Sequence, residues 1–261
     1  MPSPRRASIP PRQLYFAYGS NLWLKQMATR CPNSWYAGRA VLTDYRWQIN
    51  ERGYANIVPA SGFTVHGLVY ELGPGDEPRL DRSEGVASGA YSKAYLPVVL
   101  HPAPAALRIS TQSMVEDGGP ERIVGAARHP HGREPQASLW PGVLVYVSYD
   151  FVRWGNPRDE YIDRINSGIS DAVTMGIPQD FFENAVRDLI PRRPVVHHVN
   201  RRRSLRSRAT LETPSSPEHR RSKSAGYQGA ASPESEDERD RRAYEYYRSR
   251  GRSNMGFWYY L

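Results

Sequence analysis

The chain has 261 residues, with 35 Lys and Arg against 27 Asp and Glu, which gives a net charge of +8. Residues 201–261 hold 14 Lys and Arg and 8 Asp and Glu, so they carry a net of +6 and the rest of the chain is nearly neutral. Cys31 is the single cysteine, which excludes an intrachain disulfide and a Cys-based metal site. The first residues do not form a secretory signal and no apolar run has the length of a membrane span. We therefore expect a cytoplasmic protein without a membrane partner, and the nucleus is left open.

Composition divides the chain into three parts. We expect residues 1–12 to be a disordered N-terminus, residues 13–195 to be one folded domain, and residues 196–261 to be a disordered basic tail. That tail is rich in Arg, Ser and Tyr and has too few aliphatic side chains to bury a core.

The first predicted element is residues 14–21, LYFAYGSN. An apolar aromatic run followed by Gly-Ser-Asn predicts a buried strand, a tight turn and a helix start. Backbone N–H groups converge at such a corner, and the helix terminus adds partial positive charge. The corner is therefore suited to a carboxylate, or to a carbonyl oxygen that becomes negative during a reaction. Gly19 suits a bend or a close ligand approach, and Ser20 or Asn21 is suited to cap the helix. A plain strand-to-helix turn explains the spacing equally well.

The later elements alternate between strands and a few helices. We predict short strands at 35–41, 45–50, 55–59, 63–72, 91–100 and 139–149. A short helix passes through Leu80 toward Gly85, and two more helices follow Arg158, the second opened by Pro178. Together these elements predict an α+β fold with a mixed or antiparallel sheet that is closed or strongly curved.

Residues 116–136 are rich in Gly, Pro, Arg and His, and we interpret them as an inserted, partly disordered loop. The loop contains His129 and His131. Because no Cys and no convincing carboxylate set lies near them, we predict no metal site there.

A second motif is residues 80–91, LDRSEGVASGAY. Glu84 is predicted to lie at the end of the short helix, next to Gly85 and before an apolar run. A carboxylate that points from there into a pocket loses water, which raises its pKa toward the range of a general acid or base. A solvated helix-end Glu is the commoner interpretation of any single such residue. Asp81 is interpreted as a surface or capping residue.

The two motifs together resemble the gamma-glutamylcyclotransferases. The resemblance rests on YGSN at 18–21 and on EGVASGAY at 84–91, in that order and at that separation. Residues 157–161, PRDEY, are followed by a helix, Gly176 and a second helix, and they are similar to the helical C-terminal part of the family. The resemblance covers roughly residues 14–191, with the loop at 116–136 as an addition. It implies a small, mixed, barrel-like sheet with flanking helices.

The resemblance also implies a catalytic domain and a reaction. Such a lyase converts gamma-glutamyl amino acids to 5-oxoproline and the free amino acid, and Glu84 matches the general acid/base. The alpha-amine loses a proton to this carboxylate, attacks its own gamma-carbonyl, and the departing nitrogen takes the proton. Backbone amides of residues 18–21 are expected to hold the tetrahedral oxygen. No metal or other cofactor is needed. The positions expected to bind the substrate are Tyr15, Phe16, Ala17, Tyr18, Gly19, Ser20, Asn21, Tyr91 and Tyr161.

The basic tail supports a competing hypothesis. Residues 201–208 and 244–252 combine Arg with Ser or Tyr, a pattern compatible with RNA binding or nuclear import, although a solvated tail without a specific partner is the plainer interpretation. The alternative function is thus an inactive cyclotransferase fold that binds RNA or protein through its tail. The presence of both Glu84 and YGSN favours the enzyme. Sequence leaves open a homodimer and the choice among gamma-glutamyl amino acids, glutathione and gamma-glutamyl amines.

Overall fold

The computed structural model describes residues 13–127 and 135–193. The predictions for residues 1–12 and for the tail, and those for His129 and His131, lie outside the described residues.

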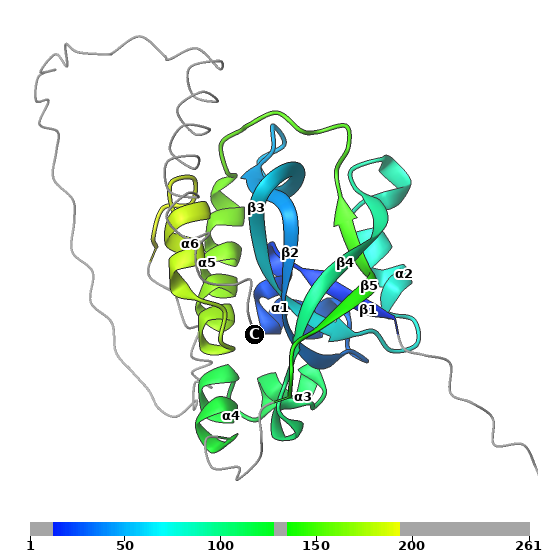
Figure 1. Ribbon diagram of the computed structural model, residues 1–261, viewed down its shortest axis with the longest axis vertical. Coiled ribbons are helices and arrows are strands. Elements are labelled where there is room, and N and C mark those ends of the chain that lie inside the picture. The colour runs from blue at the N-terminus through cyan, green and yellow to red at the C-terminus, as the bar shows by residue number, and fades with distance from the viewer. Residues whose placement is uncertain (1–12, 128–134, 194–261) are drawn as a thin grey trace, which may run out of the picture. The chain divides into compact units, whose positions relative to one another are not determined.

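Five strands in the described residues close into a barrel in the order β1-β3-β2-β4-β5 (Figure 1). Strand β1 is antiparallel to β3 and parallel to β5, where Tyr15 pairs with Leu144 and completes the barrel. This mixed closed sheet confirms the predicted α+β class. The strands are β1 Leu14–Ala17, β2 Trp35–Ile49, β3 Ala55–Glu71, β4 Ser92–Pro102 and β5 Ser138–Val147.

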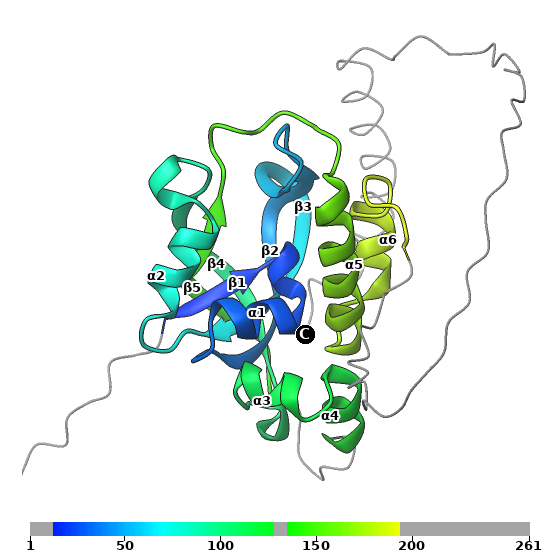
Figure 2. The ribbon, with the colours of Figure 1, turned by 180° about the vertical axis from the view of Figure 1, so that it is seen from behind.

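Helices flank the barrel on different sides. Figures 1 and 2 show α5 and α6 side by side along one side of it, α2 on the opposite side, and α3 and α4 beyond one end. Within residues 13–127 and 135–193, no helix is both long and apolar enough to cross a bilayer. The α-helices are α1 Leu24–Arg30, α2 Asp76–Ser83, α3 Thr111–Glu116, α4 Pro120–Ala127, α5 Asp159–Thr174 and α6 Gln179–Ala185. The short 3-10 turns are η1 Ser20–Leu22, η2 Val86–Ser88 and η3 Ala105–Leu107.

Strands β2 and β3 form one long hairpin, so the prediction of four short strands in this region is wrong. The ladder shifts register between Thr43 and Tyr45, and Asp44 between them has φ 60. The Asp44 carboxylate accepts a hydrogen bond from the backbone of Gly62 at 2.9 Å. A bulge of this kind bends a strand without ending it. Pro59 pairs with Tyr45 beside the bulge, where its missing N–H is tolerated.

Residues 116–136 are not a continuous loop, and this prediction is also wrong in part. Gly118 and Gly119 both have positive φ and form a turn, and Pro120 then begins helix α4. Proline is well suited to the first position of a helix, because its fixed φ is helical and its missing N–H would have no partner there. The Gly-Pro sequence is therefore a helix boundary.

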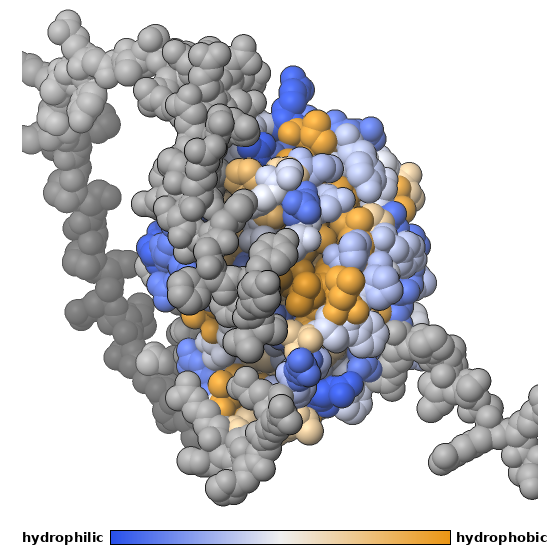
Figure 3. All heavy atoms as spheres, viewed as in Figure 1, coloured by the Kyte–Doolittle hydropathy of each residue, from blue (hydrophilic) through white to orange (hydrophobic). Residues whose placement is uncertain are grey.

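The interior of the barrel is filled by large side chains, among which Phe16, Trp47 and Tyr70 are fully buried. Cys31 is also fully buried and packs within the core. The outer face keeps some hydrophobic side chains in solvent, including Leu139 on β5, and Figure 3 shows hydrophobic residues gathered over the strands of this face.

Helix α5 packs closely on the segment that follows β1. A side chain at Gly168 would meet the Cβ of Leu22 at 3.0 Å, so the glycine permits this approach. One turn further along α5, the Asp171 carboxylate accepts a hydrogen bond from the Leu24 amide at 2.8 Å, at the start of α1. Burial raises the pKa of Asp171 to about 6, although the Leu24 amide opposes the rise. The backbone N–H at the start of α1 therefore has a hydrogen-bond acceptor, which is a carboxylate far away in the sequence.

Replacing Asp171 with Asn is expected to stabilise the protein at neutral pH. A raised carboxyl pKa means that the folded state holds the proton more tightly, so the stability from Asp171 is present below about pH 4 and is lost as pH rises through about 6. Asn keeps an oxygen for the Leu24 amide and never ionises. Urea unfolding should show a gain of up to about 3 kcal/mol near pH 7.5 and almost none near pH 4. Asp163→Asn, on an exposed part of α5, is the control; an equal gain at both pH values would contradict the argument.

Candidate functional site

The predicted acid, Glu84, lies immediately after helix α2. Its N–H donates to the Leu80 carbonyl at 2.8 Å, so it ends the helix, and Gly85 follows with φ 68. Glycine adopts this left-handed conformation without steric cost, which lets the chain turn sharply away from the helix axis. The Glu84 side chain is 16% exposed and lines a cavity of about 240 Å³. The predicted helix-end position is therefore confirmed.

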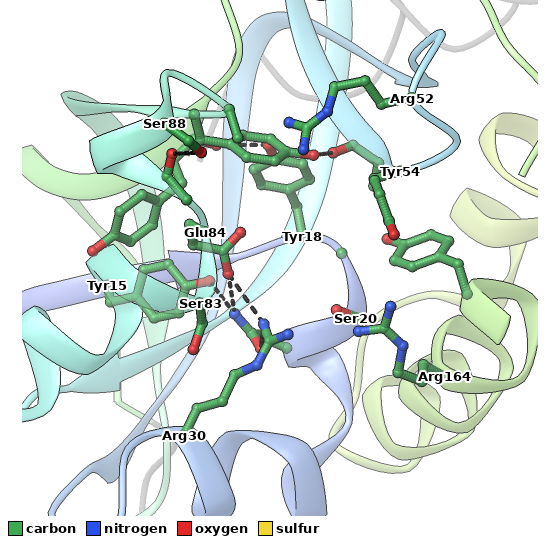
Figure 4. Close-up of a pocket in the computed structure, with 18 residues that line it drawn as sticks. Tyr15, Tyr18, Ser20, Arg30, Arg52, Tyr54, Ser83, Glu84, Ser88 and Arg164 are labelled. Atoms are coloured by element: carbon green, nitrogen blue, oxygen red, sulfur yellow. Dashed lines mark hydrogen bonds and ion pairs between the residues drawn. The ribbon is translucent and has the colours of Figure 1, made fainter. Parts of the chain in front are cut away.

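Two donors hold one oxygen of the Glu84 carboxylate. Oε1 accepts from Asn21 Nδ2 at 3.0 Å and from Arg30 Nη1 at 3.2 Å. Within the described part of the chain, nothing donates to Oε2, and Figure 4 shows this second oxygen directed into the cavity. Burial raises the pKa of Glu84, while Arg30, Asn21 and Arg164 oppose the rise. The result is a fixed carboxylate with a free oxygen and an enhanced affinity for a proton.

Asn21 connects the corner after β1 to this acid. Its amide nitrogen donates to the Tyr15 hydroxyl at 2.8 Å as well as to Glu84. Its amide oxygen accepts from Gln26 at 3.0 Å and from Arg30 at 2.9 Å, both on α1. All the hydrogen-bonding capacity of the side chain is used inside the site. Asn21 thus fixes the position of Glu84 relative to β1 and α1.

Tyr161, at the start of α5, reaches the same corner. Its hydroxyl lies 3.1 Å from where a side chain on Gly19 would begin, so glycine at 19 makes room for the tyrosine. Burial raises the pKa of Tyr161 above its ordinary value, so the hydroxyl keeps its proton and can donate it. Tyr161, which was predicted to bind the substrate, therefore lies beside the YGSN corner.

The expected helix terminus at the corner is absent from its predicted place. A 3-10 turn follows Gly19, and α1 begins only at Leu24, whose amide is bound by Asp171. Neither Ser20 nor Asn21 caps that helix, because both side chains bond to Gln26 instead. The Tyr161 hydroxyl lies against Gly19, so the corner presents a tyrosine hydroxyl where a set of free amides was predicted.

The remaining predicted residues divide between cavity and core. The rings of Tyr18 and Tyr91 line the cavity, and their hydroxyls donate to the carbonyls of Tyr146 at 2.6 Å and of Ala55 at 2.7 Å. Phe16 and Ala17 are fully buried and are not among the residues that line the cavity, so the structure does not bring these two predicted positions to it. Side chains alternate along a strand, and Phe16 points away from Tyr15 to pack against Gly67.

Sequence reasoning missed the positive charge of the cavity. Three arginines line it, Arg30, Arg52 and Arg164, against the single carboxylate of Glu84. Helical spacing offers a signal for two of them, since Arg30 lies four residues after Gln26 and Arg164 three residues after Tyr161. Arg52 belongs to the turn between β2 and β3 and has no such signal.

Two further aromatic residues of the cavity were missed, Tyr54 and Tyr146. The Tyr146 hydroxyl donates to Asp81 at 2.7 Å, so Asp81 supports the cavity wall and is more than a surface residue. A small cavity with a net positive lining, tyrosine hydroxyls and one proton-accepting carboxylate is suited to bind a small anionic molecule and to move a proton on it.

Comparison with known proteins connects this site to a family. Residues 15–112 match the family described as gamma-glutamyl cyclotransferase, AIG2-like. The chain is similar to gamma-glutamylcyclotransferase of Mus musculus, with 35% identity over 88 residues, and to that of Homo sapiens, with 33% identity over 88 residues. Each match covers 30% of this chain and 47% of the relative, so the chain spans about half the length of the relatives it matches.

Among solved structures, the chain is similar to one titled gamma-glutamyl cyclotransferase, with 21% identity and a TM-score of 0.47. That similarity covers 71% of this chain and 90% of the other. A human structure titled uncharacterized protein loc79017 has 22% identity and a TM-score of 0.46, with 66% and 85% covered.

Proposed function

We propose that the chain is a gamma-glutamylcyclotransferase acting on gamma-glutamyl amino acids, because its residues 15–112 match the family described as gamma-glutamyl cyclotransferase, AIG2-like. The observation that carries the proposal is the Glu84 carboxylate, whose Oε2 faces a cavity that Gly19 and Tyr161 also line. A gamma-glutamyl amino acid has one ammonium group and two carboxylates, so its net negative charge matches the arginine-rich lining.

Glu84 is the proton carrier in this mechanism. Its Oε2 takes a proton from the substrate's alpha-ammonium, and the freed amine attacks the gamma-carbonyl carbon. A new carbon–nitrogen bond closes the five-membered ring, the original amide carbon–nitrogen bond breaks, and Glu84 returns the proton to the departing nitrogen. The raised pKa of Glu84 favours proton uptake, and Asn21 and Arg30 keep the other oxygen in place.

The tetrahedral oxygen needs a donor, and Tyr161 is suited to supply it. Tyr161 lines the cavity beside Gly19, and burial raises its pKa, so its O–H keeps the proton and is available to donate. Charge that develops on the carbonyl oxygen is then stabilised by a donor held in place beforehand. The closed cavity also keeps the glutamyl chain folded on itself, which favours an intramolecular attack.

The direct test is turnover by the purified full chain. Incubation with gamma-glutamyl-alanine is expected to release 5-oxoproline and alanine in equal amounts, measured by chromatography. Glutathione and the gamma-glutamyl derivative of the lysine side chain are compared in parallel. If none of the three releases 5-oxoproline, the proposed function is wrong.

A further inference from the structure

Of the three arginines that line the cavity, two already have carboxylate partners. Arg30 Nη1 lies 3.2 Å from Glu84, and Arg164 Nη2 lies 2.7 Å from Glu160. Among residues 13–127 and 135–193, Arg52 has no carboxylate partner, and its buried Nη1 has no hydrogen-bond partner at all. Arg52 lines the cavity, so its guanidinium is available to a carboxylate that enters there.

Arg52 is held firmly enough to act as a binding group. Its N–H donates to Asn50 Oδ1 at 3.1 Å, and its carbonyl accepts from Arg158 Nε at 2.8 Å. Its guanidinium lies over the ring of Phe151, at 4.9 Å, and near that of Tyr54, at 5.9 Å. Stacking of this kind orients the plane of the guanidinium and leaves its edge free for a carboxylate.

The position of Arg52 in the cavity indicates which carboxylate it meets. Figure 4 shows Glu84 between Arg30 on one side and Arg52 on the other. In the proposed reaction, Glu84 contacts the alpha-amine, and the alpha-carboxylate shares a carbon atom with that amine. The alpha-carboxylate therefore falls on the side of Glu84 and Arg30. The departing amino acid extends from the far side of the gamma-carbonyl, toward Arg52.

We propose that Arg52 determines specificity by binding the carboxylate of the departing amino acid. This inference rests on the proposed function and deepens it, because it assigns the residue that makes gamma-glutamyl alpha-amino acids preferred over gamma-glutamyl amines. A bidentate arginine–carboxylate pair supplies both affinity and orientation. A substrate whose leaving group is an amine without a carboxylate leaves the Arg52 guanidinium without a charged partner, which disfavours that substrate.

The test compares gamma-glutamyl-alanine with gamma-glutamyl-ethylamine, which lacks only the departing carboxylate. The wild type is expected to prefer the alanine compound. Arg52→Met should lower kcat/KM for gamma-glutamyl-alanine by about 10- to 100-fold, mainly through KM, and change kcat/KM for the ethylamine compound by less than about 3-fold. Arg52→Lys keeps the positive charge but loses the paired N–H donors of the planar guanidinium. We therefore expect an intermediate loss of kcat/KM, confined to gamma-glutamyl-alanine.

Arg153→Met is the matched control, because Arg153 is 75% exposed, pairs with Glu51 and does not line the cavity. It should leave both substrates unchanged. Equal losses on both substrates in the Arg52 variants, or no loss on either, overturn the role of Arg52 while the proposed function stands. No 5-oxoproline from the wild type with either compound overturns the proposed function and this inference with it.

Discussion

Replacing Glu84 with Gln is expected to lower kcat/KM for gamma-glutamyl-alanine by about 10³-fold or more, since general acid–base catalysis typically contributes 10²- to 10⁴-fold. Gln has nearly the same shape, and its oxygen still accepts from Asn21 and Arg30. It cannot take the proton of the alpha-ammonium. The loss should therefore fall on turnover, measured as 5-oxoproline release, while the melting temperature stays close to that of the wild type.

The pH dependence of the wild type gives the same hypothesis a second test. The base works only when it is unprotonated, so kcat/KM should fall as pH drops through the pKa of Glu84. Burial raises that pKa, so the fall of kcat/KM on the acidic side of the pH profile should occur at a higher pH than the ordinary pKa of a glutamate predicts. Glu77→Gln is the matched control, because Glu77 lies on the same helix, pairs with Lys93 and is outside the cavity. Full activity in Glu84→Gln would remove the proposed mechanism.

Replacing Gly67 with Ala is expected to destabilise the protein by about 3 kcal/mol or more, at the upper end of the range for overpacking a core. A Cβ at this buried position would lie 2.4 Å from the Ala17 carbonyl oxygen and 2.6 Å from the Phe16 ring. The carbonyl belongs to strand β1 and cannot rotate away, so the strand itself must move. Urea unfolding measures the change in the free energy of unfolding.

Gly142→Ala is the matched control for Gly67→Ala. Gly142 is an exposed strand residue, and a Cβ there would have no atom within 4 Å. Its effect should stay within about 0.5 kcal/mol. A similar small effect for Gly67→Ala would show that β1 tolerates displacement, which contradicts a rigid corner beneath the cavity.

The local sequence pattern predicted those parts of the site whose backbone conformation depends on residues next to each other in the chain. The apolar run before Gly19 indicates strand β1, and the Glu-Gly pair at 84 and 85 indicates the end of α2. Both signals come from backbone preferences over a few residues, which a sequence shows directly. The same preferences led to an error at residues 116–136, because Gly-Pro is typical both of a loop and of a helix start.

The long-range parts of the site could not be predicted in this way. The Leu24 amide is bound by Asp171, which is 147 residues away in the chain. Arg52 has no pattern of its own, and it reaches the cavity only because the hairpin of β2 and β3 curves around the closed barrel. Phe16 and Ala17 were assigned to the substrate because the motif was treated as one block, although both side chains are fully buried in the core.

By itself, the sequence determined the α+β class, the corner that follows β1 and the acid at the end of α2, because these depend on apolar periodicity, turn residues and two motifs in order. Only the tertiary structure decided that Asn21 and Arg30 hold one oxygen of Glu84, that the Tyr161 hydroxyl lies beside Gly19, and that Arg52 has no carboxylate partner among residues 13–127 and 135–193. Hydrogen-bond pairing and burial depend on which segments, distant in sequence, come into contact when the barrel closes. Those contacts determine the charge of the cavity lining and the proton affinity of Glu84.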